Sequence, residues 1–175
     1  MTNEYSNLKE RIEEIGNNFQ TIIDTDPIKQ AEQKNQDFIR AYILLCHAEF
    51  EKYFESIVKL LYNKLNSTIG SGSFSEQELV TLNKVIENSA NITKTNNGIK
   101  ISNLKKMLEP TGFDTSTIDP VYESKIGTFA GKRCEIAHKG DPILCNTLSF
   151  NREKTDIEWL MNETEQQFDL FFYNY

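Results

Sequence analysis

Residues 38–65 read FIRAYILLCHAEFEKYFESIVKLLYNKL and carry the strongest helical signal in the chain. Apolar side chains recur there at spacings of three and four positions through Leu65, which is typical of an α-helix with an apolar face. The face is wide, so the sequence predicts a central helix that packs on more than one side. Pro27 suits the first turn of a helix, and a helix from Pro27 to Leu65 would run for about ten turns.

Helical patterns continue on both sides of this stretch. Residues 4–23 carry one apolar stripe, which predicts a first helix. Residues 67–73 contain two glycines and predict a flexible turn. Residues 75–78 (SEQE) follow the order of a capping box, which predicts a short helix to about Glu87. Residues 88–100 are polar and are expected to form an exposed loop.

Capping residues and prolines bound the remaining helices. Residues 104–108 predict a short helix that ends at about Pro110. The Asp-Pro pair at 119–120 predicts the start of a helix that extends to about His138. A second capping box at residues 155–158 (TDIE) predicts the start of a final helix that runs to the C-terminus.

Together these patterns predict an all-α fold. The expected architecture is a helical bundle of four main helices plus short helices, formed by residues 1–175 as a single domain. A length of 175 residues suits one domain, and 38% hydrophobic and 26% charged residues are typical of soluble globular proteins. No stretch reaches the roughly 18 apolar residues that a membrane span needs.

The sequence also bears on compartment and cofactors. The first residues lack the basic and apolar regions of a secretory signal peptide. Cys46, Cys134 and Cys145 show no CxxC spacing, which argues against a disulfide framework or a zinc site. A cytoplasmic location is therefore expected. The GxxxxGK[ST], GxGxxG and HExxH patterns are missing from the sequence, so no cofactor or metal is expected.

The net charge of −7 bears on any nucleic-acid function. A negative overall field opposes binding to phosphate backbones, because that binding depends on Lys and Arg displacing counterions. Any contact with RNA must therefore come from a local basic patch.

The segment GKRCEIAHKG at residues 131–140 contains the side chains best suited to chemistry. Arg133 can hold a phosphate by two parallel charge-assisted hydrogen bonds. His138 can move a proton near neutral pH. The two suffice in principle for metal-independent RNA cleavage, in which a 2′-hydroxyl attacks the adjacent phosphate. Five positions subtend about 140° on an ideal helix, so the pair converges only if the helix loosens near His138, which Gly140 would permit.

A structural interpretation of these residues stands beside the chemical one. Cations favour the C-terminal end of a helix, so Arg133 and His138 are also ordinary helix-end residues. Arg40 and His47, seven positions apart on the long helix, form a second pair that fits a loose form of the same pattern. We interpret His47 as a satisfied core or interface histidine.

The Arg-x4-His segment that ends in His138 resembles the Arg-x4–6-His motif of HEPN domains. The long helix, with RAYILLCHAEFE at residues 40–51, is similar to the early core helix of the same superfamily, in which an acidic residue often faces the motif. Glu49 matches that acid best, and Glu51 is the weaker candidate. The resemblance is to the RiboL-PSP and MAE-type HEPN groups, and it covers residues 38–138.

This resemblance implies a HEPN-like helical domain that forms a homodimer in which two Arg–His pairs line one cleft. Members are often metal-independent endoribonucleases that act as toxins or effectors in toxin–antitoxin or antiphage defence systems. Arg133 would then bind and polarise the phosphate, His138 would be the general acid or base, and Glu49 would orient one of them. Lys132 and Lys139 would form the local RNA-binding patch. An antitoxin or other defence protein would be a partner.

The chain departs from the family pattern at two positions. Cys134 follows the motif arginine, where many of these nucleases carry a small polar residue. Pro142 stands where the subgroup regulated by a nucleotidyltransferase antitoxin carries tyrosine, which argues against that pairing. The alternative functions are a non-catalytic HEPN-type binding or dimerisation module, and an unrelated helical interaction protein whose Arg–His spacing arose by chance.

Overall fold

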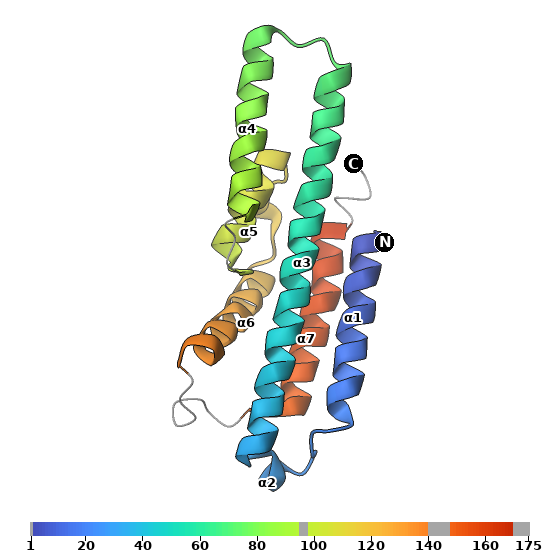
Figure 1. Ribbon diagram of the computed structural model, residues 1–175, viewed down its shortest axis with the longest axis vertical. Helices are drawn as coiled ribbons and strands as arrows, with labels where there is room; N and C mark the ends of the chain where they lie inside the picture. Colours follow the sequence, from blue (N-terminus) through green and yellow to red (C-terminus); the bar gives the residue numbers. More distant parts are fainter. Residues whose placement is uncertain (1, 95–97, 140–147, 170–175) are drawn as a thin grey trace.

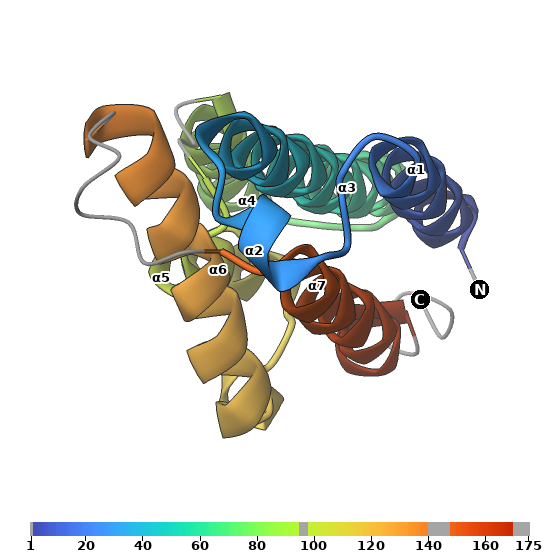
Figure 2. The same cartoon turned by 90° about the horizontal axis from the view of Figure 1, so that it is seen from below.

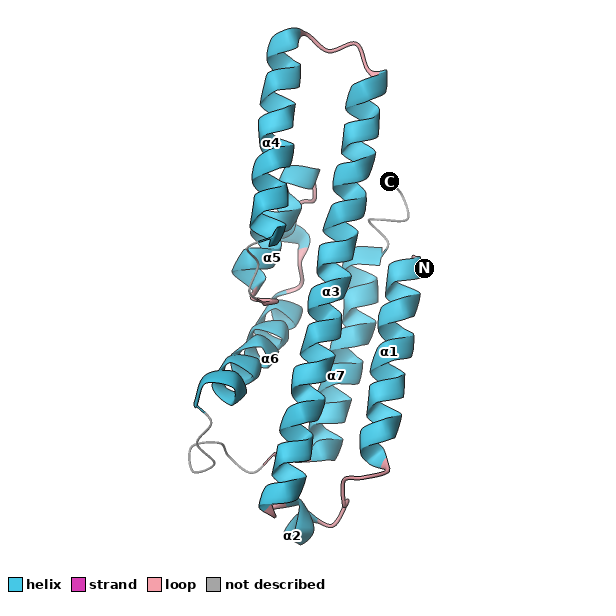
Figure 3. Cartoon of the chain, viewed as in Figure 1, coloured by secondary structure: helices cyan, strands magenta, loops and turns pink. Residues whose placement is uncertain are grey.

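The computed structural model describes residues 2–94, 98–139 and 148–169 (Figure 1). All secondary structure in these ranges is helical (Figure 3), which confirms the predicted all-α class. The α-helices are α1 (Asn3–Gln20), α2 (Pro27–Gln30), α3 (Gln33–Ser71), α4 (Glu76–Lys94), α5 (Ile101–Leu108), α6 (Pro120–Lys139) and α7 (Phe150–Thr164).

Shorter helical turns complete the described chain. The 3-10 turns η1 (Glu109–Thr111) and η2 (Thr115–Thr117) connect α5 to α6, and the π-helical turn η3 (Glu165–Asp169) extends α7. Residues 170–175, expected to continue the final helix, lie outside the described residues. Among the described helices, none combines the length and the hydropathy needed to cross a membrane.

The axis of the fold is α3. Its 39 residues give it a length of about 58 Å. α1 and α7 lie along its first half, α6 crosses this half from another side, and α4 returns along its second half with α5 nearby (Figure 1 and Figure 2). The prediction of a central helix that packs on more than one side is therefore confirmed.

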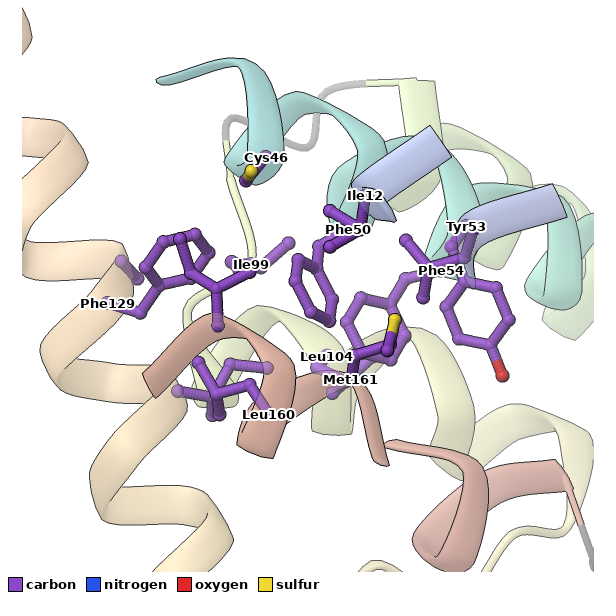
Figure 4. Packing of buried hydrophobic residues seen from close by; sticks show 14 of the residues in the cluster. Ile12, Cys46, Phe50, Tyr53, Phe54, Ile99, Leu104, Phe129, Leu160 and Met161 are labelled. Carbon is purple, nitrogen blue, oxygen red and sulfur yellow. The ribbon is translucent and has the colours of Figure 1, made fainter. Parts of the chain in front are cut away.

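Aromatic contacts show how α3 is enclosed. The ring of Tyr42 packs against Phe19 of α1 and Phe150 of α7, with centroid distances of 5.8 and 5.1 Å. On another side, Phe50 packs against Phe129 of α6 at 5.8 Å. Burying a side chain of this size contributes about 1.5–3 kcal/mol. Figure 4 shows how the core continues between the helices, with labels on Ile12, Cys46, Phe50, Tyr53, Phe54, Ile99, Leu104, Phe129, Leu160 and Met161.

Both ends of the central helix differ from the prediction. Pro27 begins the separate helix α2, and α3 starts only at Gln33. At the other end, α3 continues to Ser71 through residues that were expected to form a turn. The hydroxyl groups of this extension donate to carbonyls of the preceding helical turn, so these polar side chains are satisfied within the helix and do not end it. The Ser67 hydroxyl, for example, donates to the Lys64 carbonyl at 2.7 Å.

The first predicted capping box is confirmed, and its helix is longer than predicted. The Ser75 amide donates to Glu78 Oε2 at 2.8 Å, and the Glu78 amide donates to the Ser75 hydroxyl at 3.4 Å. α4 then continues past Glu87 to Lys94. No glycine or proline interrupts it, so the sequence contains no stop signal there. The loop expected over residues 88–100 is wrong for most of its length.

One of the two later helix starts is confirmed. Asp119 Oδ1 accepts from the Tyr122 amide at 3.0 Å and caps α6. The second start is wrong, because α7 begins at Phe150. The Thr155 hydroxyl donates to the Asn151 carbonyl at 2.9 Å inside this helix. Phe150 is 1% exposed. Burial of its ring therefore decides where the helix starts, and the capping pattern at residues 155–158 does not.

Two buried glutamines join segments that are far apart in the chain. Gln36 Nε2 donates to the carbonyls of Gln30 and Leu148 at 2.6 and 2.9 Å, and Gln36 Oε1 accepts from the Leu148 amide at 2.9 Å. Gln30 Oε1 accepts from the Phe150 amide at 3.2 Å. These bonds satisfy buried backbone groups and hold the corner between α2 and α3 against the start of α7.

We expect Gln36→Leu to lower the free energy of unfolding by about 2 kcal/mol, because it leaves backbone groups of Gln30 and Leu148 without hydrogen-bond partners. Urea denaturation followed by circular dichroism measures the change. Gln33→Leu, at an exposed position of the same helix, is the control and should change the value by less than about 0.5 kcal/mol. Equal losses in the two variants would contradict this role for Gln36.

Candidate functional site

The contact between α6 and α3 places Arg133. Phe129, one turn earlier on the same face of α6, packs against Phe50 of α3. Arg133 lies half-buried beside this contact and lines a pocket of about 360 Å³. It forms no ion pair with a carboxylate of the described residues, so its guanidinium is open to a ligand. The pocket is also lined by His47, Gly98, Ile99, Lys100, Ala130 and Cys134.

His47 is an unexpected member of this pocket. It is 2% exposed, and its ring packs against Phe129 with a centroid distance of 5.6 Å. Its Nδ1 lies 3.9 Å from Glu51 Oε2, whereas Nε2 has no hydrogen-bond partner among the described residues. Burial and the positive charge of Arg133 lower the pKa of His47 to about 4. The expected burial is confirmed, but the interpretation as a satisfied histidine is wrong for Nε2.

Residues 98–100 form the third wall of the pocket. Gly98 has a φ of 127°, in the left-handed region that favours glycine. It is buried against His47, since a Cβ at this position would lie 3.7 Å from the Cε1 atom of the imidazole. Ile99 is 1% exposed and anchors the segment in the core, while Lys100 is exposed. The sequence signal for this wall is the Asn-Gly turn dipeptide that ends in Gly98.

His138 and Lys139 belong to α6, but their side chains lie outside the described part of the structure. The backbone stays helical to Lys139, so the loosening expected near His138 is absent from the described helix. Positions 133 and 138 are therefore about 140° apart around the helix axis. A single copy of α6 does not bring them to one face, and their meeting over a phosphate stays a prediction.

Glu49 faces α1. Its Oε1 lies 3.4 Å from Arg11 Nε, and its Oε2 lies 3.8 Å from Lys52 Nζ. The structure therefore does not bring Glu49 to Arg133 through any contact among the described residues. Glu51, the weaker candidate for the acidic residue of the motif, lies beside His47 instead.

Lys132 is held by a buried carboxylate. Its Nζ lies 2.7 and 2.8 Å from the two oxygens of Glu153, which is 3% exposed on α7. The ammonium group neutralises a charge that would otherwise be costly to bury. Lys132 therefore fastens α6 to α7, and this ion pair competes with the RNA contact that the sequence suggested.

Charge sets the pocket of Arg133 apart from two others that described residues line. The pocket that contains Glu49 is lined by three glutamates and two cations. The pocket that contains Lys132 is lined by three cations and two carboxylates. No carboxylate lines the pocket of Arg133 and His47, whereas Lys100 does. In a chain of net charge −7, this is a local positive site of the kind that a phosphate contact requires.

The described cysteines, Cys46 and Cys134, are free thiols. Cys46 is buried in the core, Cys134 is half-buried in the pocket wall, and Cys145 lies outside the described residues. Within the described ranges, no three His, Cys, Asp or Glu side chains gather closely enough to hold a metal ion.

Comparison with known proteins identifies a family. A family model described as RiboL-PSP-HEPN matches residues 6–170. This match spans nearly the whole chain, including α3, α6 and the pocket between them. Neither a curated protein nor a solved structure matches the chain.

We expect Lys132→Ala to lower the free energy of unfolding by about 3 kcal/mol, because it leaves the Glu153 carboxylate buried without a partner. Chemical denaturation measures the loss. Lys125→Ala removes a half-exposed ion pair with Asp156 on the same two helices and a contact with the Trp159 ring, and should cost about 1 kcal/mol. The assignment of Lys132 to the fold would be refuted by equal costs for the two variants.

We also expect His47 to destabilise the folded state in acid. The unfolded chain takes up a proton on His47 below about pH 6.5, whereas the folded chain does so only near 4. Stability is therefore lost as the pH falls through this window, by about 2 kcal/mol between neutral pH and about pH 5. Urea titrations at both pH values should show this loss in wild type and in His138→Gln. They should not show it in His47→Gln, and an unchanged pH dependence there would disprove the expectation.

Proposed function

The chain belongs to the RiboL-PSP-HEPN family, and from this membership we propose that it is a metal-independent endoribonuclease. In the proposed reaction, a ribose 2′-hydroxyl attacks the adjacent phosphorus and the 5′-oxygen of the next nucleotide leaves with a proton. The products are a cyclic phosphate and a free 5′-hydroxyl.

The open guanidinium of Arg133 is the observation that carries this proposal. It lines a pocket with Lys100 and without a carboxylate, in a chain whose overall charge is negative. Arg binds a phosphate by two parallel hydrogen bonds and stabilises the negative charge that grows on it during attack. We therefore assign phosphate binding to Arg133.

Proton transfer is assigned to His138, following the family motif. An imidazole titrates near neutral pH, so it can take a proton from the 2′-hydroxyl or give one to the leaving oxygen. Because positions 133 and 138 diverge on one helix, a second copy of the chain is part of the proposal. The family resemblance implies a homodimer in which two Arg–His pairs line one cleft. Lys139 is proposed as an RNA contact, and no role in the reaction is carried over to Glu49.

The biological setting follows from the family resemblance alone. Relatives of this kind are often toxins or effectors of toxin–antitoxin or antiphage defence systems. We propose the same setting, in the cytoplasm, with RNA as substrate and an antitoxin or other defence protein as partner.

A non-catalytic binding or dimerisation module is the second candidate. The ion pair between Lys132 and Glu153 favours it, because one of the two lysines expected to contact RNA already neutralises a buried carboxylate. In this case Arg133 would bind a phosphate without cleavage.

Incubation of the purified chain with total RNA in EDTA tests the proposal. We expect cleavage by the wild type, and a loss of at least about 100-fold in Arg133→Ala and in His138→Ala, because each removes one group of the reaction. Arg152→Ala is the matched control: Arg152 is exposed and lines a different pocket, so its rate should stay at the wild-type level.

Circular dichroism of all four proteins separates lost chemistry from lost folding. A folded Arg133→Ala or His138→Ala variant that cleaves like the wild type would refute the assigned roles. A wild-type dimer that leaves RNA intact in EDTA would favour the binding module.

A further inference from the structure

We propose that the pocket between α3, α6 and residues 98–100 is a phosphate site in which His47 Nε2 and the Arg133 guanidinium hold the same phosphate group. The choice of RNA as the source of this phosphate rests on the proposed function. The phosphate site itself rests on the residues that line the pocket.

The unpaired imidazole nitrogen is the first argument. His47 is 2% exposed, and its Nε2 has no hydrogen-bond partner among the described residues. Leaving such a group unpaired costs about 1–3 kcal/mol, and an unsatisfied buried group in a native protein points to a missing ligand or to function. The imidazole cannot turn away easily, because its ring packs against Phe129 and Gly98.

The chemistry of the other walls defines the ligand. Arg133 and Lys100 offer only hydrogen-bond donors, and no carboxylate lines the pocket. A neutral imidazole can also donate from Nε2. A ligand that satisfies all three groups has to be an acceptor and negatively charged. A phosphate fits this set, since two of its oxygens match the guanidinium and a third remains for the imidazole.

The backbone beside the pocket adds to the positive field. Lys100 is the residue before α5, and no side chain caps the first amides of this helix. Uncapped amides at a helix N-terminus favour an anion. Gly98 has no side chain, so the backbone can approach the ligand closely at this wall.

The charges around His47 also favour the binding of an anion. The facing charged groups are Arg133 on α6, Lys100 before α5 and Glu51 on its own helix. Without a ligand, burial and Arg133 hold the pKa of His47 at about 4. A bound phosphate would offset the charge of Arg133 and favour the imidazolium form, so binding should raise this pKa.

Histidine NMR tests the site, because the chain has only two histidines. His138→Gln leaves His47 as the sole histidine and so assigns its signals. Inorganic phosphate, added to this variant and to the wild type, should shift the His47 signals in a saturable way and raise the pKa of His47 by about one unit or more. Sodium chloride at the same ionic strength should not.

Variants of the arginines give the matched comparison. Arg133→Ala should weaken the phosphate affinity by about tenfold or more, since it removes the charged pair of hydrogen bonds. Arg152→Ala should bind as the wild type does. His47 signals that ignore phosphate in wild-type protein, or an affinity that Arg133→Ala leaves unchanged, would overturn the phosphate site.

A second probe tests RNA as the source of the phosphate. A short oligoribonucleotide with 2′-O-methyl groups cannot be cleaved by 2′-hydroxyl attack, and it should produce the same shift of His47. If phosphate alone shifts the signals, the RNA part of the inference fails. Cleavage that depends on Arg133 and His138 without any shift of His47 would sink this inference and leave the proposed function standing. A shift of the His47 signals in a wild-type protein that does not cleave RNA would support the phosphate site and refute the proposed function.

Discussion

Enclosure of α3 on several sides is the constraint on which the rest of the molecule depends. A helix covered in this way has to present apolar or internally satisfied groups wherever a neighbour lies against it. Tyr42 and Phe50 follow this rule and meet rings from three other helices. His47 departs from it, with one nitrogen unpaired next to a guanidinium. Core packing fixes the neighbours of His47, so its Nε2 stays without a hydrogen-bond partner in the wall of the pocket.

Local signals in the sequence predicted most of the helices. The capping residues Ser75 and Asp119 act through bonds to amides two or three positions away, so their neighbours alone decide the outcome. The sequence did not predict the start of α7, because contacts with residues far away in the chain decide it. Phe150 is buried, and its amide bonds to Gln30, which is 120 positions away. The residues next to Phe150 in the sequence give no information about such a distant partner.

The residues of the candidate site also differ in whether the sequence predicts their role. Arg133 stands out in the sequence through its motif, and the structure places it in a pocket without carboxylates. The pairing of Lys132 with Glu153 and of Glu49 with Arg11 depends on which helices become neighbours. The role of His47 depends on residues 98–100 folding back over its ring. The two ion pairs have no local signal in the sequence, and the turn signal that ends in Gly98 does not tell which residue the segment covers.

The bonds of Gln36 to Leu148 cross 112 positions of the chain, and this separation has a consequence for biosynthesis. A ribosome adds about 5–20 residues per second and releases the N-terminal part first. α3 is therefore made several seconds before α7, and in that interval its apolar flank lacks a cover and α6 lacks its fastening. The residues that line the pocket of Arg133 all precede α7, so α6 holds them against α3 without its ion pair to Glu153 until α7 has left the exit tunnel.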